Sequence, residues 1–247
     1  MQITLDLLRA NGACEDGVNA FLGQYPDGLA DYQDVLNKCV EHDLERYAAW
    51  LLNAVGPTMD VLRIEGDLIT DKSIYICGSL YVTGSINAGG GINAGWGVNA
   101  GESIKVGWGV NAGGGINAGR GIKAGESINA GRGINAGGGI KAGENINAGR
   151  GIKAGESIKA GWGVNAGENI NAGWDINAGW GIEAGRGIKA GESIKAGWGV
   201  NAGENINAGR NYGIYAGLHA RLDDIAHRSI RAAHKPERIM TGVWVDD

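Results

Sequence analysis

The sequence of 247 residues predicts a mainly β protein: a three-sided parallel β-helix with a small N-terminal α-helical domain and a C-terminal capping segment. Three observations predict this fold. Ile or Val recurs at every sixth position from 86 to 206, Ala follows two residues later in all units but one, and Gly follows that position in every unit. Large and small residues at alternate positions indicate short strands with one buried face, and a six-residue period of such strands is typical of a parallel β-helix. Gly is expected to permit each corner because it accepts positive φ.

Residues 1–57 are predicted to form the helical domain. The segments LDLLRA, VNAFLG, YQDVLNKCV and LERYAAWLLNAV have apolar residues at the three-to-four spacing of amphipathic helices. Asp43 is a candidate N-cap of the last helix, and Gly56-Pro57 is expected to end it. Because so short a domain buries little apolar surface, we expect it to pack on the repeat region or on another chain.

Residues 58–210 are predicted to form the β-helix, in which the six-residue spacing begins at Leu62. An 18-residue rung gathers the lysines into one column, at 105, 123, 141, 159 and 195. It also makes another column Asn throughout, apart from Glu183. A 12-residue rung would scatter both sets and would stack like charges at the corners, which destabilises a ladder. We therefore expect three sides, about 18 residues per rung and about eight rungs.

Residues 211–247 are predicted to be a β-rich cap or oligomerisation segment, because an open solenoid end invites end-to-end growth. His219, Asp223 and His227 would share one face if this segment were helical, which suggests a set of metal ligands. The alternative is that short strands close the coil here and the histidines are solvated. The second interpretation is favoured, so we expect no metal site and no cofactor.

The charge distribution argues against several classes of partner. Residues 1–84 hold five Lys and Arg against 13 Asp and Glu, whereas residues 85–210 hold 12 against nine. The repeat region therefore lacks the strongly basic surface of a nucleic-acid-binding protein.

Three cysteines without C-x-x-C spacing favour free thiols in a reducing compartment. No signal peptide and no apolar run of about 20 residues is visible, so a cytoplasmic protein without membrane association is expected.

Two resemblances add to this interpretation. Residues 62–210 resemble three-sided β-helices of the hexapeptide and bactofilin kind, and GSLYVTGSINAGG is especially similar to bactofilins. Hexapeptide acyltransferases place the small residue two before the aliphatic residue and use a histidine of the coil as base. Here the small residue lies two after, and the coil has no histidine. Separately, LLRANGACEDGVNAF together with AHKPERIMTGVWV resembles uncharacterised proteins of bacteriophages and prophages, which implies a bacterial cytoplasmic setting.

The best candidate site is a corner rich in tryptophan. An 18-residue rung places Trp162, Trp180 and Trp198 on successive rungs, with Trp108 further along the same corner and Lys159 and Lys195 beside them. Exposed indoles beside cations suit a protein partner, a sugar or stacked bases. Alternatively, the indoles stack on one another and on the aliphatic parts of the lysine side chains. Their role would then be to cover the corner of the coil and not to bind a partner. The Asn column is expected to form amide ladders that fix the register, rather than the flat array that ice binding requires.

These features predict a non-enzymatic interaction protein that forms homo-oligomers. We expect a phage or prophage accessory factor that binds or inhibits a host protein, with a host defence protein as the candidate partner. The alternatives are a polymer-forming scaffold joined through the solenoid ends, or a small-ligand-binding protein or enzyme that uses His219 and His227 at a subunit interface.

Overall fold

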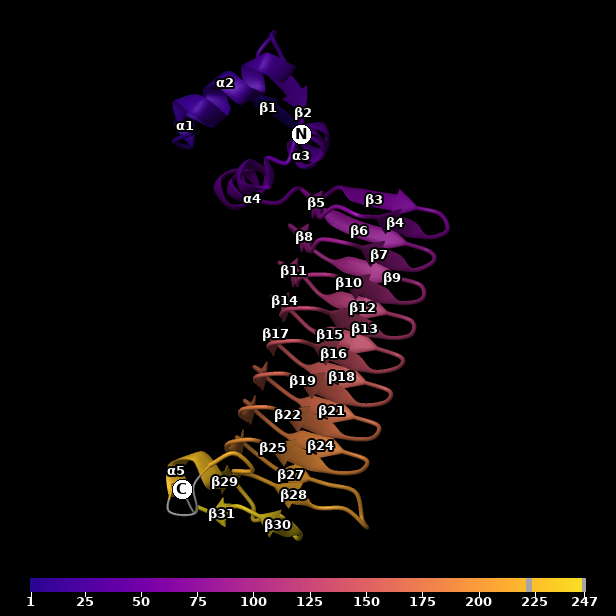
Figure 1. Cartoon of the computed structure of the whole chain (residues 1–247), viewed down its shortest axis with the longest axis vertical. Coiled ribbons are helices and arrows are strands. Elements are labelled where there is room, and N and C mark those ends of the chain that lie inside the picture. The colour runs from indigo at the N-terminus through magenta and orange to yellow at the C-terminus, as the bar shows by residue number, and fades with distance from the viewer. Residues whose placement is uncertain (221–223, 246–247) are drawn as a thin grey trace.

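The computed structural model describes residues 1–220 and 224–245 and shows a long rod (Figure 1). Three parallel sheets run along the rod, and consecutive strands of the chain enter the three sheets in turn. Each strand of the regular coil pairs with the strand 18 residues away, as Ile104 pairs with Ile122. The three-sided coil with an 18-residue rung is confirmed.

The strands of the three sheets are two to four residues long. Sheet 1 consists of β3 (Val61–Ile64), β6 (Ser79–Val82), β9 (Val98–Ala100), β12 (Ile116–Ala118), β15 (Ile134–Ala136), β18 (Ile152–Ala154), β21 (Ile170–Ala172), β24 (Ile188–Ala190) and β27 (Ile206–Asn207). Sheet 2 consists of β4 (Leu68–Thr70), β7 (Ile86–Ala88), β10 (Ile104–Val106), β13 (Ile122–Ala124), β16 (Ile140–Ala142), β19 (Ile158–Ala160), β22 (Ile176–Ala178), β25 (Ile194–Ala196), β28 (Ile214–Tyr215) and β30 (Ile239–Thr241). Sheet 3 consists of β5 (Ile74–Ile76), β8 (Ile92–Ala94), β11 (Val110–Ala112), β14 (Ile128–Ala130), β17 (Ile146–Ala148), β20 (Val164–Ala166), β23 (Ile182–Ala184), β26 (Val200–Ala202), β29 (Ser229–Arg231) and β31 (Val243–Trp244).

The rod has about ten turns rather than the expected eight, since two of its sheets contain ten strands and the third contains nine. The difference arises in the C-terminal segment, where β28 and β30 extend sheet 2 while β29 and β31 extend sheet 3. The expected number of turns was based on the six-residue spacing, which ends at Ile206. It did not include these later strands, because irregular loops separate them.

A continuous apolar core fills the rod. The Ile or Val that begins each regular strand and the Ala that ends it both point inward and are buried. Burying one such aliphatic side chain contributes roughly 2 kcal/mol to the stability of the folded state. Each six-residue unit adds a similar contribution along the rod.

The glycine after each Ala is required by close packing, which corrects the sequence-based explanation. Among the described residues, the glycines with positive φ all lie outside positions 85–210. A Cβ atom added to Gly143 would instead overlap the carbonyl oxygen of Gly125 in the preceding rung. The corner therefore needs a residue without a side chain because adjacent rungs approach so closely there.

The predicted N-terminal helices are confirmed as α1 (Leu5–Ala10), α2 (Glu15–Gln24), α3 (Tyr32–Glu41) and α4 (Glu45–Ala54). A two-stranded antiparallel ribbon, β1 (Gln2–Thr4) with β2 (Leu29–Asp31), was not predicted. The expected cap at Asp43 is wrong: Leu44 is the N-cap residue of α4, and the carboxylate of Asp43 lies 3.0 Å from Lys72 Nζ. No helix within the described residues has the length and apolarity needed to cross a membrane.

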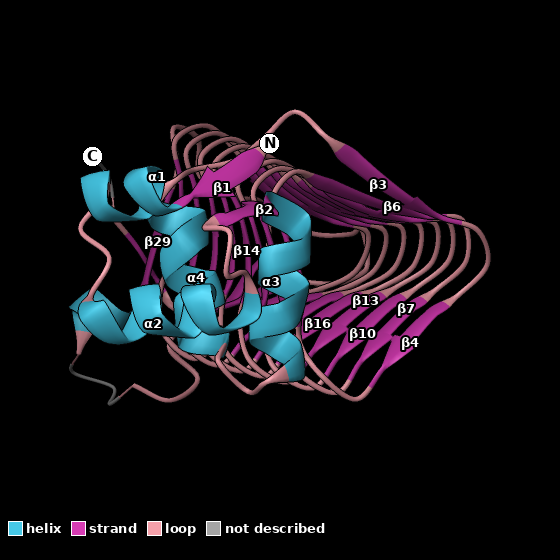
Figure 2. Cartoon of the chain, turned by 90° about the horizontal axis from the view of Figure 1, so that it is seen from above, coloured by secondary structure: helices cyan, strands magenta, loops and turns pink. Residues whose placement is uncertain are grey.

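The helical domain packs on the first strand of sheet 3, as expected. Tyr75 and Cys77 belong to the apolar core of the helical domain rather than to that of the rod. The Gln33 side chain donates to the carbonyl oxygen of Tyr75 at 2.7 Å and accepts from the backbone N–H of Cys77 at 3.1 Å. Seen along the rod, the helices lie over one side only, away from β3 and β4 (Figure 2).

The first rung is consequently open on two of its three sides. Leu62 in β3 is 39% exposed, whereas Leu80, its neighbour in the next rung, is fully buried. Ile69 in β4 is 72% exposed because it occupies the outward-facing slot, which Asn87 and Lys105 fill in the next two rungs. An apolar strand edge thus remains accessible at this end of the rod.

Candidate functional site

Three of the four predicted tryptophans form a stack at the corner between sheets 2 and 3. The ring centroids of Trp162 and Trp180 are 5.3 Å apart with planes inclined by 9°, and those of Trp180 and Trp198 are 5.3 Å apart with planes inclined by 5°. The His227 ring packs against Trp198 at a centroid distance of 4.4 Å and ends the stack. We call Trp162, Trp180 and Trp198 the tryptophan ladder.

The ladder arises because the in-register β-helix places equivalent corner residues directly above one another. Backbone hydrogen bonds fix this spacing, since Trp180 N–H donates to the Trp162 carbonyl at 3.0 Å and Trp198 N–H donates to that of Trp180 at 3.1 Å. Trp108 does not join the stack, because Glu126 and Glu144 occupy the two intervening positions of the column. The sequence-based grouping of all four tryptophans is therefore only partly correct.

The stacked indoles remain accessible at their edges. Trp162, Trp180 and Trp198 are 41%, 46% and 38% exposed, although neighbouring rings cover the faces of the central indole. The edges form a continuous apolar ridge along the corner. Recognition of bases requires open aromatic faces, so this arrangement suits a protein surface better.

The predicted lysines lie on sheet 2 beside this ridge. Lys159 and Lys195 are both exposed, and the Lys195 ammonium lies 5.6 Å from the centroid of the Tyr215 ring, a cation–π contact. Lys159 is also the last of four lysines on successive rungs, which we call the lysine ladder: Lys105, Lys123, Lys141 and Lys159. No described residue forms an ion pair with any of these lysines within 4.0 Å.

Ion pairing at the corners of the coil is sparse. Among the described residues of the coil, the stacked pair Glu102 and Arg120 is the one ion pair, at 3.9 Å. Glu183 and Arg186 do not form an ion pair. Long, exposed side chains gain little from such pairs, because ordering them costs conformational entropy.

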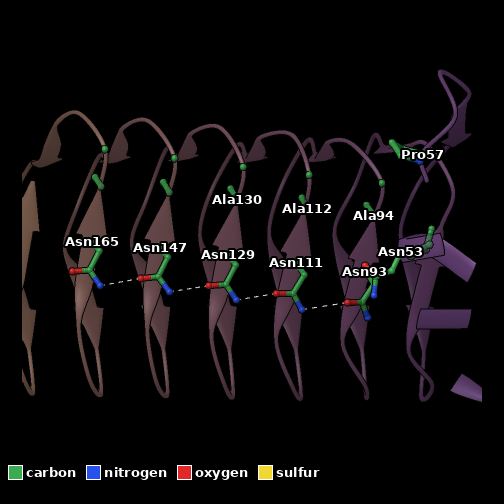
Figure 3. Close-up of a pocket in the computed structure, with 18 of the residues that line it drawn as sticks. Asn53, Pro57, Asn93, Ala94, Asn111, Ala112, Asn129, Ala130, Asn147 and Asn165 are labelled. Atoms are coloured by element: carbon green, nitrogen blue, oxygen red, sulfur yellow. Dashed lines mark hydrogen bonds between the residues drawn. The ribbon is translucent and has the colours of Figure 1, made fainter. Parts of the chain in front are cut away.

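The Asn column of sheet 3 forms the predicted amide ladder (Figure 3). Each Asn donates its side-chain N–H to the side-chain oxygen of the Asn in the preceding rung, at 2.8–3.2 Å, from Asn111 through Asn129 and Asn147 to Asn165. The ladder stops at Glu183, which has no amide to donate. Two rungs after Asn165, the side-chain oxygen of Asn201 is buried with no hydrogen-bond partner in the described part of the chain.

A groove of about 880 Å³ runs along this asparagine ladder. Helix α4 and Pro57 close its head (Figure 3). Glu183 is among the residues that line its far end. Each ladder Asn uses one donor and one acceptor within the ladder and keeps the others for solvent. The groove depends on how the helical domain overhangs sheet 3, so periodicity alone could not predict it.

A second cavity, of about 420 Å³, lies among the four N-terminal helices. Its floor is apolar and includes Leu8, Phe21 and Leu51, and Lys38 and Arg46 are at its mouth. Burial raises the pKa of the nearby Cys39 thiol to about 11. This cavity has no sequence signature, because it is formed by helix packing rather than by a motif.

The C-terminal histidines are separately engaged. His219 Nδ1 lies 3.1 Å from the carbonyl oxygen of Gly179, and His227 Nδ1 lies 2.6 Å from Asp224 Oδ2. The hydrogen bond from His227 lowers the pKa of the Asp224 carboxyl. Helix α5 (Ile225–Arg228) does not reach His219, so the helix required by the metal interpretation is not present in the described residues.

The third residue of that proposed ligand set, Asp223, lies outside the described residues. In the ranges 1–220 and 224–245, no three His, Cys, Asp or Glu residues are arranged to hold a metal ion.

Residues 1–55 match a family model described as the YdhT N-terminal domain. The match covers the helical domain and ends before the first strand of the rod, so the similarity does not extend to the solenoid. No curated protein and no solved structure matches the chain.

Proposed function

We propose that this protein is a non-enzymatic interaction protein that holds a partner protein against its tryptophan ladder. The observation that carries this proposal is the stack of three indoles, each 38–46% exposed, on a rigid rod. Tryptophan is enriched among the residues that dominate protein–protein binding energies, because a single indole removes a large apolar area from water.

Preorganisation supports the same function. The three indoles are already held parallel by one another and by the in-register backbone, so little side-chain entropy is lost when a partner covers them. Lys159 and Lys195 provide charged groups at the rim of the apolar ridge. This combination of a central aromatic ridge and a polar rim is typical of protein interfaces.

The resemblance to phage and prophage proteins suggests the biological setting. In this proposal the protein acts in the bacterial cytoplasm as an accessory factor of a phage or prophage and binds or inhibits a host protein, with a host defence protein as the candidate partner. The absence of histidine from the coil favours binding over acyltransferase chemistry.

An affinity pull-down from bacterial lysate tests the proposal. The W162A/W180A/W198A variant is compared with wild type and with W174A, which removes a half-exposed tryptophan from another corner. We expect a protein retained by wild type and W174A to be lost with the triple variant, with at least a 100-fold weaker Kd once that partner is purified. Equal retention by all three proteins would reject the ladder as the binding surface.

A polymer-forming scaffold is the second candidate, and the open first rung favours it. The edge of β3 carries the exposed apolar residues Val61 and Leu62. Such an edge can pair with the last rung of another copy. Electron microscopy of concentrated protein should then show filaments that L62K abolishes, and small particles at every concentration would rule this candidate out.

A further inference from the structure

The lysine ladder places four like charges in one line. Lys105, Lys123, Lys141 and Lys159 are direct partners on β10, β13, β16 and β19, and all four are exposed. Adjacent strands lie about 4.8 Å apart, so the four backbone positions span roughly 14 Å along the rod. No described residue neutralises these ammonium groups within 4.0 Å.

Stability does not explain this column. Like charges that lie directly opposite one another destabilise a sheet, whereas the Asn column of sheet 3 gains a hydrogen bond at most rungs. The nearest acids do not compensate either. Glu144 follows Lys141 by three residues, but its carboxylate accepts a hydrogen bond from the Ser127 hydroxyl at 3.0 Å and forms no ion pair with a lysine of the ladder. The ladder therefore presents positive charge to solvent and to a partner.

We propose that the lysine ladder binds an extended acidic segment of the partner protein, laid along the axis of the rod. This inference rests on the proposed function and specifies the chemistry of the partner. In an extended chain, alternate side chains lie about 6.7 Å apart, so about five residues with acids at alternate positions match the ladder.

The ladder leads directly to the tryptophans. Lys159 ends the run of four lysines, and Trp162 begins the tryptophan ladder at the adjacent corner only three residues later. The sheet 2 column itself continues from Lys159 to Asn177 and Lys195. A partner segment that follows the lysines therefore runs beside the apolar ridge and reaches the indoles at the adjacent corner.

A peptide fits this surface better than a nucleic acid does. Glutamates occupy the corners on both sides of sheet 2, with Glu126 and Glu144 on one side and Glu102 and Glu156 on the other. These carboxylates repel a wide polyanion but leave a single-file path above the lysines. Rings also pack against both sides of Trp180 and Trp198, which leaves the outer face of Trp162 as the one indole face of the ladder on which a base could stack.

Fluorescence anisotropy with a labelled twelve-residue oligoglutamate peptide, in 50 mM and 500 mM NaCl, tests the proposal. K123Q/K141Q removes two stacked lysines, and K153Q/K189Q removes two lysines from the equivalent slots of sheet 1. All four lysines precede a glutamate by three residues, which makes the two variants matched. We expect K123Q/K141Q to weaken binding at least tenfold at low salt and to flatten its salt dependence, while K153Q/K189Q stays within twofold of wild type.

Three results would overturn the proposal: no binding of the peptide at low salt, equal weakening by the two variants, or tighter binding of a twelve-nucleotide oligothymidylate than of the peptide. The peptide has no aromatic residue, so W162A/W180A/W198A should bind it as wild type does. Failure of the lysine ladder is thereby distinguished from failure of the tryptophan ladder.

Discussion

Single residues determine where each ladder of this rod begins and ends. The asparagine ladder continues while Asn follows the inward-facing aliphatic residue, and it stops at Glu183, which cannot donate an amide hydrogen bond. The corner glycines show a different constraint, because the carbonyl oxygen of the preceding rung excludes even a methyl group. The repeat thus reflects contacts made 18 residues apart.

Glu183→Asn should stabilise the protein. The new amide can donate to the side-chain oxygen of Asn165 in the preceding rung and accept from the side-chain N–H of Asn201 in the next. Two added hydrogen bonds predict a gain of about 1–2 kcal/mol in the free energy of unfolding, measured by chemical denaturation. Glu168→Asn, which removes an acid from a corner outside the ladder, is the control. The ladder explanation fails if both variants have the stability of wild type.

At the scale of elements, the helical domain and the rod have separate apolar cores. Cys39 belongs to the core of the helical domain, where burial raises the pKa of its thiol from 9.0 to about 11. A raised thiol pKa means that the folded state favours the neutral form. Its contribution to stability is therefore complete below pH 9 and is lost as the pH rises towards 11.

Alkaline titration followed by far-UV circular dichroism should show this loss. The free energy of unfolding of the helical domain is expected to fall by an amount on the order of 2 kcal/mol between pH 9 and pH 11. The helical part of the spectrum should therefore be lost at a lower temperature, whereas the strand part, which reports on the rod, should change less. Cys39→Ala should reduce the pH dependence over that window even though it lowers stability at pH 7, and the buried Cys77 thiol, whose pKa is also raised, accounts for a remaining part. A pH dependence unchanged by this substitution would assign the effect to other groups.

The periodicity of the sequence predicted the repeating strands of the coil, but it did not predict the ribbon formed by β1 and β2. The strands of the regular coil, the 18-residue rung and the asparagine ladder all follow from spacing in the sequence. The ribbon of β1 and β2 involves only three residues per strand and has no pattern to detect. The short strands predicted to close the coil are confirmed as β29 to β31, although irregular loops kept them out of the count of rungs. The parallel stacking of the indoles and the groove beneath α4 depend on side-chain directions and domain packing.

At the scale of the whole molecule, the protein is a rod with a helical domain at one end and two adjoining surfaces along its length (Figure 1). The lysine ladder occupies sheet 2, and the tryptophan ladder occupies the following corner nearer the C-terminal end. Their shared axis predicts a partner that lies lengthwise on the rod. The structural rigidity of the stacked rungs makes this surface available without rearrangement.

Site-specific photo-crosslinking in bacterial cells tests the central claim most directly. A photoreactive phenylalanine analogue replaces Trp180, at the centre of the tryptophan ladder, or Trp174, a half-exposed tryptophan at another corner. The proposed function predicts a discrete crosslinked protein from position 180 and none from position 174. Identical adducts from the two positions, or no adduct from position 180, would contradict the claim that the tryptophan ladder is a protein-binding surface.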